Sequence, residues 1–172
     1  MAASGKESQY LEVPYIYTSG EYLYTCGELS EFFRAIKDEK RLLGAKCPAC
    51  SKVWMPARGY CPDCYEAVSW VPLSGEGRIV AHSYCYYPGM TGDLVKFLDL
   101  PYVQAMVHLD GTDSYLMSAI AVHEQRMGTM KDGMRVRAVF REERKGTIAD
   151  FYFEVVGEAQ GGNRSGEESG VV

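Results

Sequence analysis

The chain has 172 residues, of which 47% are hydrophobic, so it can bury the core of one domain, or of one domain with a small appendage, without disulfides. No apolar run approaches the roughly 18 residues of a membrane-spanning helix. The first residues, MAASGKESQYLEVPY, lack the basic and apolar regions of a secretory signal. These properties predict a cytoplasmic protein that keeps its thiols reduced and does not associate with membranes.

The net charge of −5 is spread along the chain. Residues 1–45, 71–156 and 157–172 each carry −2, and residues 46–70 carry +1. A protein that binds the phosphate backbone of a nucleic acid needs a basic stripe, and no segment supplies one. The charge pattern therefore disfavours a nucleic-acid partner.

Residues 1–45 are predicted to form a tyrosine-rich arm and one amphipathic helix over residues 30–43. Because tyrosine joins a large apolar ring to a hydroxyl group, such an arm usually packs against a surface, either its own domain or a partner. Ser30 is a suitable N-cap for the helix and Gly44 a suitable stop. The arm's tyrosines are Tyr10, Tyr15, Tyr17, Tyr22 and Tyr24, and the helix's apolar residues are Phe32, Phe33, Ile36, Leu42 and Leu43.

Residues 46–70 contain two Cys-Pro-x-Cys motifs, each of which places two thiols on one turn. Two such turns joined by a short hairpin offer four thiolates in a tetrahedral arrangement, the usual ligand set of structural zinc. Ser51 and Tyr65 stand where a glycine often follows the second cysteine, so we expect these turns to be looser than usual. The predicted ligands of Zn²⁺ are Cys47, Cys50, Cys61 and Cys64.

Other uses of these cysteines were weighed against zinc. Iron fits the same four-sulfur geometry and stays open as an alternative. A thioredoxin-type redox pair needs one motif on a βαβ scaffold, and a disulfide needs an oxidising compartment, so both are disfavoured. Four protein ligands leave no position for a reacting water, which predicts a structural metal. Lys46, Lys52 and Arg58 lie in the same segment and offset the negative charge of a four-thiolate site.

Residues 71–156 are predicted to form five strands, because five runs rich in β-branched and aromatic residues are separated by turn sequences without a long helix. Arg135, Arg137 and Arg141 alternate with apolar residues, as in a strand with one solvated face. The simplest arrangement is a five-stranded OB-fold barrel, with a sandwich as the alternative. Residues 157–172 are rich in Gly, Ser and Glu, which predicts a disordered tail. The five runs are 78–87, 102–109, 114–122, 134–142 and 148–156.

The sequence supplies no catalytic set. His82, His108 and His123 lie in or beside predicted strands without a Cys–His or Ser–His–Asp order, so each is interpreted as a partly buried or surface histidine. Cys85 lies in an apolar run and is interpreted as a small core residue. The fold class predicted overall is mainly β: an N-terminal helix, a zinc ribbon and then the barrel.

This order of elements resembles the DUF35 family of rubredoxin-like zinc-ribbon plus OB-fold proteins. The family often has Pro-Pro-Arg where Pro56-Ala57-Arg58 stands here, a departure that leaves the arginine in place. The matching stretches span residues 30–156 and are FFRAIKDEKRLLGAKCPAC, MPARGYCPDC, WVPLSGEGRIVAHSY, PYVQAMVHLDGTD, KDGMRVRAVF and TIADFYFEVV.

The resemblance implies a non-catalytic accessory subunit in a hetero-oligomer with a thiolase-like subunit, which carries the active-site cysteine and histidine. It also implies that CoA or acyl-CoA is bound mainly by that partner, with contacts from Lys46, Lys52 or Arg58 to the CoA phosphates as a hypothesis. The particular reaction hypothesised for the complex is thiolysis of benzoylsuccinyl-CoA in anaerobic toluene degradation.

Two hypotheses of other classes are weaker. An OB barrel can bind single-stranded nucleic acid by stacking bases on aromatic residues, here Tyr84, Tyr86 and Tyr87, although the negative barrel segment argues against it. A barrel mouth can also serve a stand-alone carrier of a small ligand.

Overall fold

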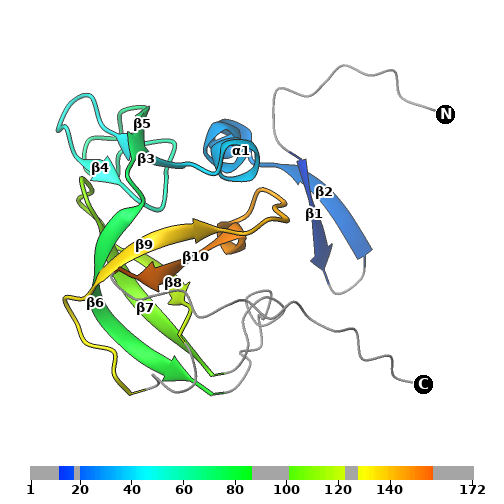
Figure 1. Ribbon diagram of the computed structural model, residues 1–172. Helices are drawn as coiled ribbons and strands as arrows, with labels where there is room; N and C mark the ends of the chain where they lie inside the picture. Colours follow the sequence, from blue (N-terminus) through cyan, green and yellow to red (C-terminus); the bar gives the residue numbers. More distant parts are fainter. Residues whose placement is uncertain (1–11, 18–19, 87–100, 123–127, 157–172) are drawn as a thin grey trace, which may run out of the picture.

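The computed structural model describes residues 12–17, 20–86, 101–122 and 128–156 (Figure 1). Tyr10, Tyr87, His123 and the predicted tail 157–172 lie outside the described residues. No helix within the described ranges is long and apolar enough to cross a membrane.

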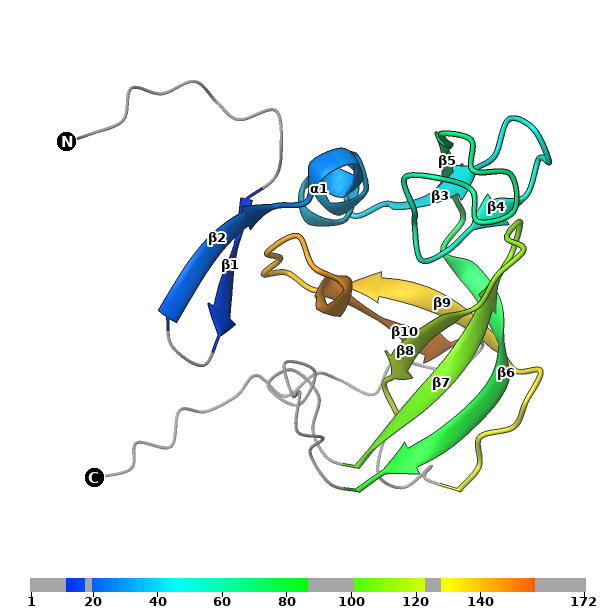
Figure 2. The same ribbon diagram turned by 180° about the vertical axis from the view of Figure 1, so that it is seen from behind.

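The described part of the chain begins with a hairpin that sequence analysis did not predict. Strands β1 (Glu12–Tyr17) and β2 (Gly20–Thr25) pair antiparallel, with Tyr15 opposite Tyr22. The alternation of tyrosine with aliphatic residues, noted only as a packing signal, is also the period-two pattern of a strand. Both views place this hairpin on the far side of α1 from the ribbon (Figures 1 and 2).

A short 3-10 helix, η1 (Gly27–Leu29), leads into α1 (Ser30–Glu39). The helix is shorter than predicted, because Lys40 adopts a left-handed conformation with φ 51° and its N–H bonds back to the carbonyl of Ala35. The prediction that Ser30 is the N-cap is also wrong. Ser30 is the first helical residue, and its hydroxyl donates to the carbonyl of Gly27 at 2.6 Å.

The two leucines assigned to the helix belong to the next element, β3 (Leu42–Lys46), where both are buried. This strand lies between β4 (Val53–Trp54) and β5 (Ser69–Leu73) in a three-stranded sheet. Gly44, predicted to stop the helix, is instead a point of close packing. A Cβ at this position would lie 2.5 Å from Cγ1 of Val53, so only glycine fits without a shift.

Five further strands close into a barrel in the order β10-β8-β7-β6-β9, which confirms the predicted OB-fold architecture. Neighbouring strands are antiparallel except β8 and β10, which are parallel and share one register pair, Ile120 with Phe153. A second 3-10 helix, η4 (Ile148–Asp150), precedes the last strand. The strands are β6 (Glu76–Cys85), β7 (Tyr102–Leu109), β8 (Leu116–Ile120), β9 (Arg135–Phe140) and β10 (Phe151–Val155).

The core runs through the barrel to α1 and β3 without a break. The ring of Phe32 stacks on that of Trp70 with centroids 6.4 Å apart, which joins the helix to the ribbon sheet. Arg144 joins the helix to the barrel, because its Nε donates to the carbonyl of Lys37 at 2.6 Å. The largest fully buried side chains include Phe32, Ile36, Leu42, Met55, Ile79, Leu109, Leu116, Ile120, Phe151 and Phe153.

The ribbon sheet and the barrel are joined directly at the outer edge of β4. Val53 donates its N–H to Oδ2 of Asp113 and accepts the N–H of Asp113 at its carbonyl, both at 2.8 Å. The hydroxyl of Ser114 accepts the N–H of Met55 at 2.7 Å and donates to its carbonyl at 2.8 Å. The turn between β7 and β8 therefore continues the ribbon's hydrogen bonding and fixes its orientation on the barrel.

Candidate metal centre

The two cysteine motifs fold into turns with the same hydrogen bonds. In the first turn, between β3 and β4, the N–H of Ser51 donates to the carbonyl of Cys47 at 3.0 Å, and the N–H of Cys47 to the carbonyl of Lys52 at 2.9 Å. In the second turn, Tyr65 donates to Cys61 at 2.8 Å and Cys61 to the carbonyl of Glu66 at 2.9 Å. The ribbon therefore presents two equivalent turns, which we call the first and second knuckles (residues 47–52 and 61–66).

The expectation of looser turns is wrong. Ser51 and Tyr65 adopt φ values of 62° and 59°, the left-handed region that a glycine would adopt without strain. Both turns therefore close normally, although Ser51 and Tyr65 adopt a backbone conformation that is strained for residues other than glycine.

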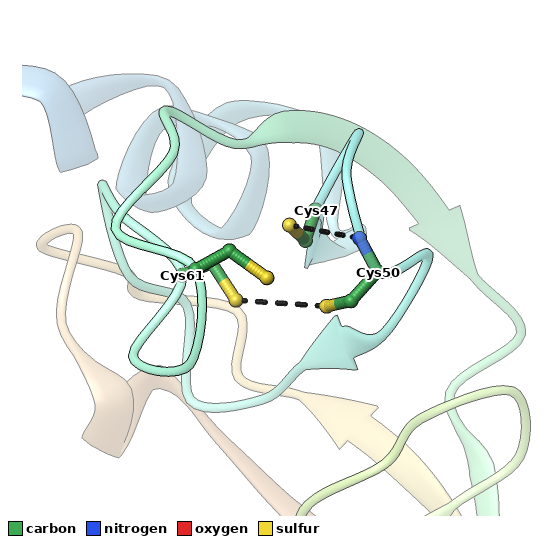
Figure 3. Close-up of side chains that lie close together, drawn as sticks. Cys47, Cys50 and Cys61 are labelled. Carbon is green, nitrogen blue, oxygen red and sulfur yellow. Dashed lines mark hydrogen bonds between the residues drawn. The ribbon is translucent and has the colours of Figure 1, made fainter.

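The four thiols gather at one point between the knuckles. Their sulfur atoms all lie within 4.8 Å of one another, and Sγ of Cys50 is 3.7 Å from Sγ of Cys61 (Figure 3). In a tetrahedral site with metal–sulfur bonds of about 2.3 Å, sulfur atoms are separated by roughly 3.8 Å. Cys47 and Cys61 are fully buried, while Cys50 and Cys64 are half-buried. The described cluster therefore fits a tetrahedral metal ion held by Cys47, Cys50, Cys61 and Cys64.

Crowding moves the pKa values of Cys61 and Cys64 in opposite directions. For Cys61, burial acts to raise the pKa, but N–H groups of Cys64 and Asp63 and the neighbouring thiols lower it to about 7. A hydrogen bond with Cys50, together with burial, raises the pKa of Cys64 to about 12. Four neighbouring thiols therefore do not all ionise on their own, and a divalent cation is the group that makes four thiolates compatible.

The three basic residues of the segment lie in different surroundings. Lys52 reaches across to the second knuckle, with Nζ 2.6 Å from Oδ2 of Asp63, and this hydrogen bond raises the pKa of Lys52. Nζ of Lys52 also lies 5.8 Å from the ring centroid of Trp54, and the guanidinium carbon of Arg58 lies 6.0 Å from it. Lys46 is exposed at the end of β3. The structure thus brings Lys52 and Arg58 together at Trp54.

Sequence analysis missed Trp54 and Asp63 as parts of this site. The signal for Trp54 was its position in a short hairpin between two cationic residues, a spacing that allows cation–π contacts. Asp63 could be suspected only from its position inside the second motif, because its pairing with Lys52 depends on how the knuckles face each other.

The two described histidines, His82 and His108, are partly buried, as predicted, and both contact polar groups of the barrel. Nδ1 of His82 lies 2.8 Å from Oδ1 of Asp132. Nε2 of His108 lies 2.7 Å from the carbonyl oxygen of Thr112, so this nitrogen carries the proton. Cys85 is half-buried at the end of β6 and not a core residue.

One of the tyrosines proposed to stack bases is not available on the surface. Tyr84 is partly buried and packs against the core, with its ring edge-on to that of His82 at 5.6 Å. Tyr86 is exposed. A stacking platform made of both residues is therefore not present, which weakens the nucleic-acid hypothesis.

A four-cysteine ribbon that is hydrogen-bonded to a five-stranded Greek-key barrel defines a rubredoxin-like zinc-ribbon plus OB-fold protein. Two family models match the chain in that order: "ChsH2, rubredoxin-like zinc ribbon domain" over residues 34–68 and "ChsH2, C-terminal OB-fold domain" over residues 70–141. The chain belongs to the DUF35 family, whose zinc-ribbon and OB-fold domains it carries.

A curated relative from Methanocaldococcus jannaschii, described as a "DUF35 domain-containing scaffold protein", is 29% identical over 111 residues, which cover 63% of this chain and 74% of the relative. The solved structure described as "Ltp2-ChsH2(DUF35) aldolase" matches with a TM-score of 0.56 and 21% identity over 75% of this chain and 94% of that one. A DUF35 protein of unknown function from Sulfolobus solfataricus matches with a TM-score of 0.54 and 18% identity over 76% of this chain and 86% of that one. At these identities, the two structures support the shared fold alone.

Proposed function

We propose that this chain is a non-catalytic, zinc-binding accessory subunit of a thiolase-type acyl-CoA enzyme complex. The observation that carries the proposal is a closed four-sulfur cluster followed by an OB-fold barrel. A relative of this chain is described as a DUF35 domain-containing scaffold protein, which supports an accessory role. The protein supplies all four ligands of a tetrahedral site, so the metal has no position left for a substrate. The description of a DUF35 protein with an aldolase in a solved complex is further support for a catalytic partner.

The metal proposed for the cluster is zinc, with Cys47, Cys50, Cys61 and Cys64 as its ligands. Zinc suits four thiolates in a site without redox chemistry. It stabilises the fold because most residues of the two knuckles are exposed and contribute little buried surface. Elemental analysis of the purified chain is expected to give one zinc per chain. One iron per chain, with its colour in visible light, would assign the site to iron instead.

The accessory role is tested by separating the two subunits. The chain purified alone should show no thiolysis of acyl-CoA thioesters, and part of it should aggregate where its docking surface is uncovered. Co-expression with a thiolase-type subunit should give a stable hetero-oligomer with thiolytic activity. Activity from the chain alone would overturn the proposal, and so would a fully active thiolase subunit that never binds the chain.

The arm is proposed as one docking element, and the structure shows which residues can be deleted to test this without damaging the ribbon. A deletion of residues 1–43 would also remove α1 and the buried Leu42 and Leu43 of β3, so it would damage the ribbon. Deleting residues 1–26 removes the β1–β2 hairpin and leaves η1, α1 and the ribbon sheet intact. This deletion should abolish complex formation without lowering the zinc content.

Contacts from the ribbon to CoA phosphates are the finer part of the proposal. Arg58 is chosen for the test because it is exposed and lies beside the indole of Trp54, whereas Lys52 is already paired with Asp63. Arg58→Ala should leave the complex assembled and raise KM for CoA several-fold, whereas Arg137→Ala, an exposed arginine on the barrel, should not change it. An unchanged KM would remove the CoA contact and leave the accessory role standing.

The substrate proposed for the complex is benzoylsuccinyl-CoA, which the family resemblance suggests. A bulky aromatic acyl group needs a pocket that excludes water and holds the thioester in position. A second subunit can supply a wall of that pocket. The reconstituted complex should cleave benzoylsuccinyl-CoA with a higher kcat/KM than acetoacetyl-CoA, and the opposite order would overturn this choice of substrate.

A further inference from the structure

The two knuckles have the same backbone but very different surfaces. In the first knuckle, the left-handed position holds Ser51, a small exposed residue. In the second knuckle, the same position holds Tyr65, whose side chain is 82% exposed. Since the backbone hydrogen bonds are equivalent, the first knuckle shows what this turn needs for folding, and a large aromatic residue is not part of it.

Tyr65 is unusual for two independent reasons. A bulky residue with φ 59° is an outlier, because the left-handed region is disfavoured for side chains larger than glycine's. A ring that is 82% exposed also gains little from packing within its own chain. A strained residue with a water-exposed ring points to a function outside the fold, and exposed tyrosine is a residue type enriched in protein interfaces.

The residues around Tyr65 indicate what kind of partner surface this knuckle can bind. Tyr60, just before the second knuckle, is 55% exposed, and its hydroxyl lies 3.5 Å from Oε1 of Glu28. Glu66 follows Tyr65 and is exposed, and Asp63 lies in the same turn, with Lys52 as its ion-pair partner. The thiolate cluster beneath adds negative charge when it holds a divalent metal. This surface is therefore aromatic and acidic, whereas Lys52 and Arg58 flank the indole of Trp54.

The same surface continues toward the N-terminal segment. A Cβ at Gly59 would lie 2.8 Å from Oε2 of Glu28, so η1 packs closely on the loop that enters the second knuckle. The loop around Cys61 lies on the side of the ribbon nearest α1 (Figure 3). The second knuckle therefore adjoins η1, the short segment that connects the β1–β2 hairpin to α1.

We infer that the second knuckle, through Tyr65 with Tyr60 and Glu66, is the ribbon's docking surface for the catalytic partner, and that it fits an apolar depression rimmed by arginine or lysine. The inference rests on the proposed function and names the surface by which the accessory subunit binds. Charge complementarity selects a basic partner surface, and arginine can also stack on the exposed tyrosine rings. The zinc ligands of this knuckle hold the surface rigid, so little conformational freedom is lost on docking.

The test compares single variants of the full-length, zinc-loaded chain in binding to its thiolase-type partner. Tyr65→Ser copies the residue of the first knuckle and should preserve the zinc content and the unfolding temperature. It should weaken binding at least tenfold, as loss of a central tyrosine does at interfaces. Tyr86→Ser removes another exposed tyrosine at the end of β6 and should change Kd less than twofold. Glu66→Lys should also weaken binding, because it reverses the charge that faces a basic rim. The increase in Kd should be larger at low salt than at high salt, since salt screens the repulsion.

The outcomes separate this inference from the proposed function. If the wild-type chain binds the partner and Tyr65→Ser binds equally well, the docking surface is wrong and the accessory role stands. If the wild-type chain binds no thiolase-type protein, both fail. If Tyr65→Ser instead converts a dimer of this chain into a monomer, as measured by light scattering, the surface binds a second copy of this chain and not the catalytic partner. That result would overturn the inference.

Discussion

The junction between the ribbon and the barrel gives a prediction whose size follows from the structure. The hydroxyl of Ser114 makes both of its hydrogen bonds with the backbone of Met55, a residue that is 1% exposed. Ser114→Ala removes the acceptor of the Met55 N–H and the donor to the Met55 carbonyl. A buried polar group left without its partner costs about 1–3 kcal/mol, so two such groups, partly rescued by water, should cost about 2–3 kcal/mol.

That loss is measurable by thermal and urea unfolding of the zinc-loaded protein. For a chain of this size, 1 kcal/mol corresponds to about 2–4 °C, so the unfolding temperature should fall by roughly 4–12 °C. The urea midpoint should fall while the slope of the transition stays the same. Ser83→Ala is the matched control, because Ser83 is exposed on β6. If Ser114→Ala unfolds within 1 °C of the wild type, these hydrogen bonds do not join the two units.

Three further predictions concern the metal, the sheet and the surface charges. Cys61→Ser should lose its zinc and much of its resistance to proteolysis in residues 42–73, and full zinc occupancy by elemental analysis would remove Cys61 from the ligand set. Gly44→Ala should destabilise the chain by about 1–3 kcal/mol in urea unfolding, since its Cβ would overlap Val53, and an unchanged midpoint would contradict the close packing. A hydrogen bond from Arg135 holds the pKa of Asp110 below its ordinary value. The pair therefore stabilises the fold at any pH above the ordinary pKa of aspartate, and this stabilisation is lost as the pH falls through the lowered pKa. Asp110→Asn should therefore unfold more easily than the wild type at pH 7, and this difference should shrink as the pH falls below the ordinary carboxyl pKa. A difference that does not change with pH would refute the assignment.

The elements with a strong local pattern could be predicted from the sequence. The barrel strands follow the alternation of apolar and polar residues, and glycine-containing turns mark their ends. The cysteine spacing alone predicts the clustering of the four thiols that the structure describes, because two turns on one hairpin leave few other arrangements. The metal itself and its four ligands stay a prediction.

The errors arose where tertiary packing overrides local pattern. Leu42 and Leu43 continue a helical spacing, but burial on both faces of the ribbon sheet draws them into β3, and Lys40 ends the helix without a glycine. Gly44 was interpreted as a stop signal, although the closeness of Val53 is the reason that glycine is needed there. The contact between Trp54 and Arg58 depends on the fold of the hairpin, because the spacing of these residues allows the contact but does not specify it.

The parallel pairing of β8 and β10 has a consequence for how the protein is made. β10 is the last strand of the described residues, and it pairs with β9 on one side and β8 on the other. Until Phe151–Val155 leaves the ribosome, the nascent barrel has two open edges, at β8 and at β9, whose unpaired backbone groups can recruit strands of other chains. Truncation anywhere before Phe151 should thus yield a far more aggregation-prone product than a cut after Val156. Translation of Phe151–Val155, more than the formation of the ribbon, therefore sets the moment at which the barrel is protected from misassembly.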